Sequence, residues 1–262
     1  MAVEVEVEVE DFWANPPWEE GIKKHRLGLR LIYVDDWLKS DVELLANKCH
    51  LLKTRYHDVV RQDPQLQSLD YSSWGLPWSI EGDHPDWIAN LGAGIAEDIC
   101  LLDLADQQRL IAGCVVAPSY WSLEAKLGLP MWQIHQPVEG MNAKIGDNVR
   151  KFLANIPLQS PFYRYNWFVH DEGSYFPKGP ATFDVAASNW VIRSEQQVLY
   201  RPSESHLLLT IRVLFAQLKD AGLHPHALPG LRASLELMDE DEINHFGGVA
   251  KHRRLVEYVR QL

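Results

Sequence analysis

Phe162-Tyr-Arg-Tyr-Asn-Trp-Phe-Val-His170 is an aromatic-rich stretch whose residue types favour a β-strand. Side chains two positions apart in a strand point to the same side. Arg164 and Asn166 therefore share one face, and the aromatic residues at 163, 165 and 167 share the other. The stretch predicts a strand with polar side chains on one face and aromatic rings on the other.

Four further runs have the same strand-like character, at residues 97–103, 109–117, 190–200 and 206–214. In the third run Arg193, Glu195 and Gln197 share a face, and in the fourth Thr210 and Arg212 do. Ionisable side chains inside apolar strands are costly to bury unless they are paired or functional. The pattern leaves two interpretations: a structural salt bridge between Glu195 and an arginine, or a polar pocket on one face of the sheet.

Helices are predicted on either side of these strands. Ser40 and Glu43 have the spacing of a capping box, which starts a helix. That helix is predicted to bury one apolar stripe, formed by Val42, Leu45, Cys49, Leu52 and Tyr56. A second helix is predicted near 142–154, and the chain from 232 onward is predicted to be helical again. Runs of strands without regular β-α-β alternation predict an α+β fold with a mainly antiparallel sheet.

The acidic composition narrows the range of partners. The 262 residues include 36 acidic and 25 basic side chains, for a net charge of -11. A negative net charge does not favour binding to nucleic acid or to an anionic membrane surface. No apolar run approaches the roughly 20 residues of a membrane span, and no signal-peptide pattern is present. We expect a cytoplasmic protein with one domain at 28–262, preceded by an N-terminal tail at 1–27.

Cysteines and motifs exclude several kinds of cofactor site. The three cysteines are too few for an iron–sulfur cluster, and the C-x-x-C-H motif of covalent haem is absent. No phosphate loop, dinucleotide fingerprint, G-x-S-x-G elbow or H-E-x-x-H zinc motif occurs. His135, two residues before Pro137, is either a core or turn residue or a metal or haem ligand. His170, His206 and His245 are weaker candidates.

A series of short segments follows the order seen in a known family. The segments are Gly28-Leu-Arg-Leu, Trp37, the Leu51-Leu52 helix, Glu97-Asp98-Ile-Cys-Leu-Leu102, Trp121-Ser-Leu-Glu-Ala-Lys-Leu-Gly128, Ile134-His-Gln-Pro-Val138, Arg164-Tyr-Asn-Trp167, Arg193-Ser-Glu-Gln-Gln-Val-Leu199, Leu209-Thr-Ile-Arg212 and Phe246-Gly-Gly. In this order the chain resembles the haem-dependent oxidative N-demethylase-like family, from residue 28 to its end.

The resemblance implies a PAS-like antiparallel sheet that cradles haem b, with additional helices around it. It also implies a monooxygenase-type oxidoreductase that removes a methyl group from a small secondary amine with oxygen and releases formaldehyde. Electrons would come from a partner reductase that carries flavin and an iron–sulfur cluster. The alternatives are a PAS-like haem or small-ligand sensor without turnover, because fold alone does not set function, and a haem-free relative.

The resemblance implies roles for five residues. His135 matches the axial ligand of the haem iron, and Asn166 and Arg212 are assigned to cofactor binding. Arg164 matches the distal donor to dioxygen, because a guanidinium supplies fixed N–H groups that do not lose their protons. Glu195 matches the carboxylate that receives the substrate ammonium, in an ion pair that is stronger where water is excluded.

Overall fold

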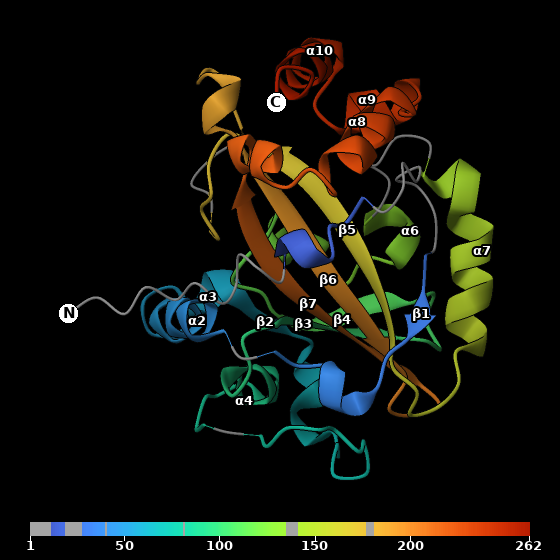
Figure 1. Ribbon diagram of the computed structural model, residues 1–262. Helices are drawn as coiled ribbons and strands as arrows, with labels where there is room; N and C mark the ends of the chain where they lie inside the picture. Colours follow the sequence, from blue (N-terminus) through green and yellow to red (C-terminus); the bar gives the residue numbers. More distant parts are fainter. Residues whose placement is uncertain (1–11, 19–27, 40, 81, 135–140, 177–180) are drawn as a thin grey trace.

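The chain folds around one antiparallel sheet. The computed structural model describes residues 12–18, 28–39, 41–80, 82–134, 141–176 and 181–262 (Figure 1). The strands in this part are β1 (Arg30–Leu31), β2 (Val60–Gln62), β3 (Asp98–Asp103), β4 (Arg109–Cys114), β5 (Phe162–His170), β6 (Val191–Tyr200) and β7 (His206–Gln217). Their order is β1-β5-β6-β7-β3-β4-β2, and each neighbouring pair is antiparallel. The expected α+β class and antiparallel sheet are confirmed.

Helices lie around the sheet. They are α2 (Val42–Thr54), α3 (Tyr56–Val59), α4 (Trp87–Ala93), α5 (Leu123–Lys126), α6 (Met131–Ile134), α7 (Met141–Asn155), α8 (Leu228–Glu236), α9 (Glu240–His245) and α10 (Val249–Val259). Figure 1 shows α7 along one side of the sheet, α2 on the other side, α4 near its lower end, and α8, α9 and α10 at its upper end. The helix predicted near 142–154 is α7, and the predicted helical tail consists of α8, α9 and α10.

The five predicted strand runs correspond to β3, β4, β5, β6 and β7. Strands β1 and β2, which have only two and three residues, were not predicted. A two-residue period cannot be recognised in so short a segment. Both lie at the edges of the sheet, where they pair with β5 and β4.

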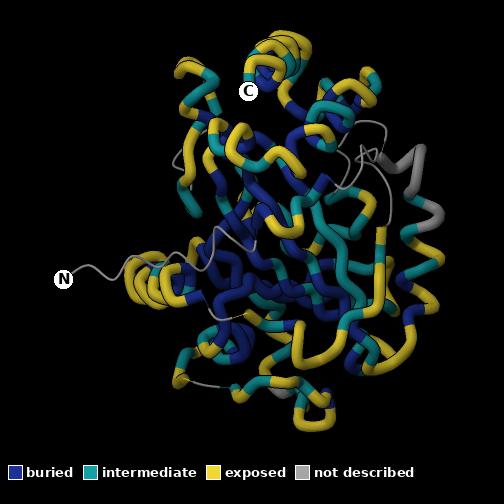
Figure 2. Tube along the Cα trace, viewed as in Figure 1, coloured by how far each residue is buried: buried dark blue, intermediate teal, exposed yellow. Residues whose placement is uncertain are grey.

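The register sorts the side chains onto two faces. Asn166 pairs with Glu195, which pairs with Val213, so these three side chains lie on one face, here called the Glu195 face. Its core consists of Cys100, Leu102, Leu110, Leu199 and Leu207, packed against Leu123, Leu153 and Ile156. The opposite face carries two larger clusters, one with Trp37, Ile99, Leu101, Val198 and Leu208, the other with Trp167, Ile192, Leu214, Leu231 and Leu255. Figure 2 shows the buried residues concentrated along the central strands.

Residues 12–18, within the segment assigned to an N-terminal tail, pack against the domain. Trp18 is buried and donates from its indole nitrogen to the carbonyl oxygen of Ala227 over 2.8 Å. Trp13 stacks on His224 with ring centroids 4.6 Å apart. Both tryptophans belong to the opposite-face cluster that includes α8 and α10. The alternating Val and Glu residues of 2–10 lie outside the described residues.

The stripe predicted for helix α2 is right in part, because Leu52 is buried and Leu45 packs half-buried against the core. Val42 and Cys49 are exposed, whereas Leu44, Leu51 and the charged Lys48 are buried. The reason is that the Lys48 ammonium donates to three carbonyl oxygens, those of Gly92 (3.2 Å), Ile95 (2.9 Å) and Glu97. Asp41 caps the helix by accepting a hydrogen bond from the Leu44 N–H, and the predicted cap Ser40 lies outside the described residues.

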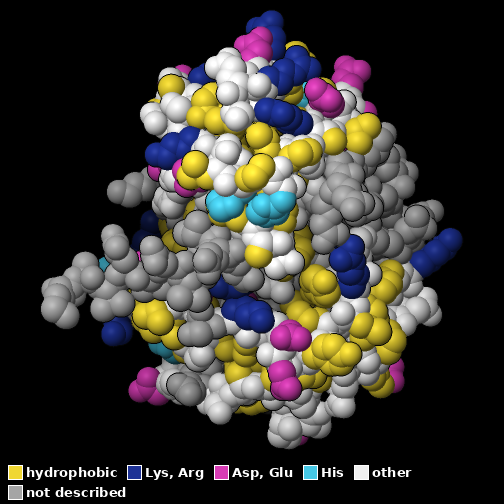
Figure 3. Space-filling model, viewed as in Figure 1, with side chains coloured by type: hydrophobic (Ala, Val, Ile, Leu, Met, Phe, Trp, Pro, Cys, Tyr) yellow, Lys and Arg dark blue, Asp and Glu magenta, His cyan; other side chains and the backbone are white. Residues whose placement is uncertain are grey.

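The surface carries charges of both signs. Figure 3 shows acidic and basic side chains dispersed among apolar ones on the face in view. In the described part of the chain, no helix combines the length and apolar character needed to cross a membrane.

We expect Lys48→Met to lower the free energy of unfolding by about 3 kcal/mol, because three buried carbonyl groups would lose their charged donor. The measurement is urea unfolding of the wild type and the variant. Lys53→Met, at an exposed position of the same helix, is the matched control and should change stability little. Equal unfolding midpoints for Lys48→Met and the wild type would contradict the structural role of Lys48.

Candidate functional site

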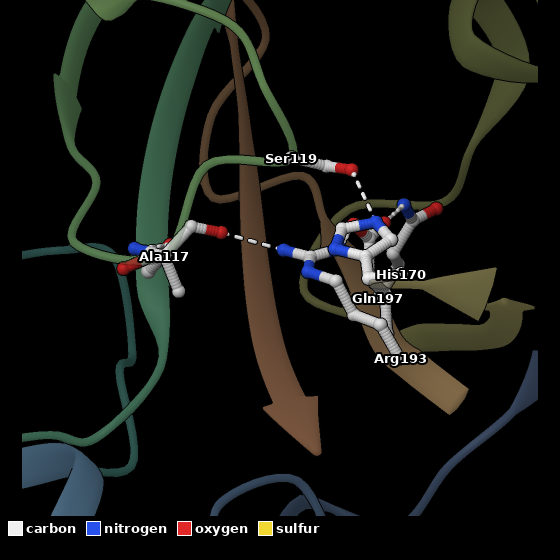
Figure 4. Close-up of polar contacts among 7 residues, drawn as sticks. Ala117, Ser119, His170, Arg193 and Gln197 are labelled. Atoms are coloured by element: carbon white, nitrogen blue, oxygen red, sulfur yellow. Dashed lines mark hydrogen bonds and ion pairs between the residues drawn. The ribbon is translucent and has the colours of Figure 1, made fainter. Parts of the chain in front are cut away.

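A polar cluster occupies the middle of the Glu195 face. The register of β5 and β6 places Asn166 beside Glu195, Arg164 beside Gln197 and Phe168 beside Arg193. Figure 4 shows Arg193 directed toward Ala117 and His170 directed toward Ser119. The cluster therefore joins two neighbouring strands with the segment that follows β4.

Arg193 and Glu195 form a buried ion pair. Their exposed fractions are 2% and 8%, so both charges lie in the interior. Nη1 of Arg193 donates to Oε1 of Glu195, and Nη2 donates to the carbonyl oxygen of Ala117 over 2.5 Å. Nε2 of Gln197 donates to Oε2 of Glu195 over 2.8 Å. The predicted salt bridge between Glu195 and an arginine is thus present, with Arg193 of the same strand as its partner.

Glu195 is held as a carboxylate. Burial alone would raise its pKa, because desolvation disfavours the charged form. The charge of Arg193 and the hydrogen bonds from Arg193, Gln197 and Asn166 outweigh that effect, so the pKa lies below the ordinary value. A carboxylate offers about four acceptor positions, which leaves Glu195 room for one further donor.

His170 ends β5 on the same face and is buried. Its Nε2 lies 3.2 Å from Oγ of Ser119, and its ring lies 4.7 Å from that of Tyr120. Burial, followed by the charges of Arg193 and Lys251, lowers the pKa of His170 to about 3. His170 is therefore neutral at physiological pH.

Val213, which pairs with Glu195, is completely buried, but three other apolar side chains near the cluster are only half-buried. They are Phe168 on β5 and Ile211 and Phe215 on β7, all on the Glu195 face. Their neighbours on the opposite face, Arg212 and Leu214, are buried. Because β7 is an inner strand, half-burial at its middle means that the Glu195 face is covered less completely than the opposite face.

The structure brings three of the five predicted site residues together. Arg164, Asn166 and Glu195 share the Glu195 face, where Arg164 is half-buried. Arg212 pairs with Gln196 and lies on the opposite face, where its Nε is 4.0 Å from Oδ2 of Asp41. His135 lies outside the described residues.

The sequence puts Arg193 on the same face as Glu195 and offers a salt bridge between Glu195 and an arginine, without specifying which one. One further contributor to the site was missed. Asp98, in a quoted segment, is buried and accepts hydrogen bonds from the N–H groups of Val116 and Ala117. An acidic residue at the start of an apolar run was the available signal.

The cluster suits binding of a polar group inside an apolar surface. Glu195 provides a fixed negative charge, and neutral His170 and the half-buried rings provide an apolar wall. Among the described residues, no group of three or more His, Cys, Asp or Glu side chains could hold a metal ion. A haem iron needs only an axial ligand from the protein, so a cluster of this kind is not required for haem binding.

The lowered pKa of His170 predicts acid sensitivity. In the folded state the His170 ring stays neutral down to about pH 3. In the unfolded chain the same ring takes up a proton near pH 6.5. Between these values the unfolded state binds more protons, so stability falls as pH falls, by about 1.4 kcal/mol per pH unit. We expect His170→Gln to show a shallower loss of stability in urea unfolding between about pH 6 and about pH 4. His57→Gln, at an exposed position, should keep the wild-type slope, and an unchanged slope in His170→Gln would contradict the prediction.

The chain matches a known protein family over most of its length. Residues 34–257 match the family described as haem-dependent oxidative N-demethylase, alpha subunit-like. The matched range contains β2 to β7 and most of α10. The segments quoted from Trp37 to Phe246-Gly-Gly lie within it, and Gly28-Leu-Arg-Leu precedes it.

Proposed function

Because the chain belongs to the haem-dependent oxidative N-demethylase, alpha subunit-like family, we propose that it binds haem b on the Glu195 face and oxidatively demethylates a small secondary amine. The observation that carries the proposal is the buried Arg193–Glu195 pair at the centre of a half-buried apolar sheet face. Such a surface offers apolar contact area to a ligand and places the Glu195 carboxylate, paired with Arg193, within it.

The residues of the Glu195 face fit a haem. Phe168, Ile211 and Phe215 are half-buried apolar side chains in the middle of the sheet, and they provide the apolar contact that a porphyrin ring requires. The antiparallel sheet and its flanking helices also support the PAS-like architecture. Non-covalent haem b agrees with the absence of a C-x-x-C-H motif.

We propose that His135 would hold the haem iron. The two helices nearest to it in sequence both pack on the Glu195 face, since Ile134 of α6 and Phe152 of α7 contact its core. The ring of Phe152 lies 5.4 Å from that of Phe162 on β5. Asn166 is proposed to contact the cofactor, whereas Arg212 is left out of the site because it lies on the opposite face.

When bound, haem supplies the redox chemistry, by which an N-methyl group, dioxygen, an electron pair and two protons give the demethylated amine, formaldehyde and water. Arg164 supplies N–H donors to negative charge that develops as oxygen is reduced. Glu195 accepts a hydrogen bond from the substrate ammonium at its remaining acceptor position. Arg193 and Gln197 keep that carboxylate in place before the amine arrives.

The electrons are proposed to come from a reductase partner that carries flavin and an iron–sulfur cluster. The description of the family as alpha subunit-like supports a partner subunit or reductase. The chain has three cysteines, fewer than one such cluster requires.

A sensor that binds haem or a small ligand without turnover is the second candidate. The ion pair with Arg193 favours it, because the charge of Glu195 is already balanced without an amine. Formaldehyde release by the reduced, haem-loaded protein supplied with a secondary amine separates the two functions.

We expect His135→Ala to lose or strongly shift the Soret absorption band of the haem-reconstituted protein while the chain remains folded. His50→Ala, at an exposed position of α2, should keep the wild-type spectrum. Circular dichroism checks that both variants fold. An unchanged Soret band in His135→Ala would reject His135 as the ligand and leave His170 as the buried histidine on the same face.

We expect Glu195→Gln to weaken amine binding by about 1.5–3 kcal/mol, the usual contribution of a hydrogen bond to a charged group. The amine-induced shift of the Soret band measures this affinity. Because the variant also leaves the buried Arg193 charge unmatched, its free energy of unfolding should fall by about 3 kcal/mol. Glu204→Gln, which breaks an exposed pair with Arg201, should change neither quantity by more than about 1 kcal/mol. Lost stability with unchanged amine affinity would reject the substrate role of Glu195.

A further inference from the structure

We propose that Asp98 is a positioning residue. It holds residues 116–120, here called the 116–120 loop, against the Glu195 face. Through that loop it fixes the positions of the Arg193 and His170 side chains. For its effect on amine binding, the proposal rests on the proposed function. The contacts themselves are independent of it.

Both carboxylate oxygens of Asp98 accept hydrogen bonds from the start of the loop. Oδ1 accepts a hydrogen bond from the N–H of Val116 over 2.7 Å, and Oδ2 accepts one from the N–H of Ala117 over 3.0 Å. Asp98 is 2% exposed, and Val116 and Ala117 are buried as well. The chain has just left the sheet at this point, so Asp98 replaces the partners that a neighbouring strand would supply.

The residues next in the loop contact the polar cluster. The carbonyl oxygen of Ala117 accepts the 2.5 Å hydrogen bond from Nη2 of Arg193, whose Nη1 binds Glu195. Oγ of Ser119 lies 3.2 Å from Nε2 of His170. One short loop therefore touches both the ion pair and the buried histidine (Figure 4).

The far end of the loop is tied to β5. Tyr120 has a φ of 58°, a left-handed conformation that is unfavourable for a large side chain. Its hydroxyl donates to Oδ1 of Asp171 over 3.1 Å, directly after His170. Asp98 therefore binds the backbone at one end of the loop, and Asp171 binds the Tyr120 side chain at the other.

A substitution at Asp98 should therefore alter the position of Glu195 through the contacts of Ala117 and Arg193. In Asp98→Asn the side chain keeps its shape, but an N–H₂ group replaces one acceptor and faces a backbone N–H donor. One buried N–H loses its partner, and the carbonyl of Ala117 moves away from Arg193. Arg193 then holds Glu195 less firmly, and the carboxylate is less well placed for an amine.

The test measures amine affinity by the Soret shift in Asp98→Asn and in Asp103→Asn. Asp103 ends the same strand and also caps a backbone N–H, that of Ala105 over 2.9 Å, but it lies away from the cluster. Loss of a supporting partner typically costs about tenfold or more, so we expect about tenfold weaker amine binding in Asp98→Asn. Asp103→Asn should bind amine as the wild type does.

A double variant shows whether the effect passes through Glu195. If it does, Asp98→Asn should weaken amine binding no further when introduced into Glu195→Gln. A full additional tenfold loss would overturn the proposed route, as would wild-type amine affinity in Asp98→Asn when Glu195→Gln does weaken binding.

A second readout does not depend on haem or amine. In the imidazole ¹⁵N spectrum of the full chain before haem is added, Ser119→Ala identifies the signal of His170. Asp98→Asn should move that signal in the same direction, and Asp103→Asn should not. A moved signal with amine affinity unaffected in both Asp98→Asn and Glu195→Gln supports the positioning role and rejects the proposed function. An unmoved signal overturns the positioning of His170.

Should Asp98→Asn fail to fold, Arg193→Lys tests the same route. Lysine keeps the positive charge but cannot bridge the Ala117 carbonyl and Glu195 with two nitrogens. We expect about tenfold weaker amine binding here too, and wild-type affinity would overturn the proposal.

Discussion

The opposite charges of Arg193 and Glu195 are buried together in a central strand of the sheet. Neither charged group could be buried without the other, because desolvation costs several kcal/mol for each ion. Side chains two positions apart on a strand project from the same face, which lets one strand supply both partners. Gln197, Asn166 and the 116–120 loop complete the hydrogen bonds of the pair. The remainder of the Glu195 face is arranged around this neutral unit.

Buried charge alone does not mark a functional site in this fold. Lys48 is completely buried, yet three carbonyl groups surround its ammonium, and large aromatic and aliphatic side chains fill the space beside it. The Arg193–Glu195 pair differs because, although Val213 beside it is buried, three of its other apolar neighbours, Phe168, Ile211 and Phe215, are only half-buried. A satisfied charge in a closed core stabilises the fold, whereas one on a partly covered face can also meet a ligand.

The sequence predicted the long strands and the sharing of one face by Arg193, Glu195 and Gln197, because the two-residue period of a strand is a local property. It also predicted Arg164 and Asn166 on one side of β5, although only the register shows that this side is the Glu195 face. The burial of α2 was predicted only in part, because a charged residue such as Lys48 is not expected in the interior of a protein. Asp98 could not be connected with Arg193 from sequence, because their link passes through a backbone carbonyl of a loop.

The packing of residues 12–18 joins distant parts of the chain. Trp18 binds the carbonyl oxygen of Ala227, which lies 209 positions further along. Because a ribosome releases the chain from its N-terminus, Trp13 and Trp18 emerge long before the helices that cover them exist. The upper core therefore cannot close until synthesis has passed α8, and until then these tryptophans are exposed to solvent and to chaperones. Helices α8 and α10, made later, complete the burial of these two tryptophans.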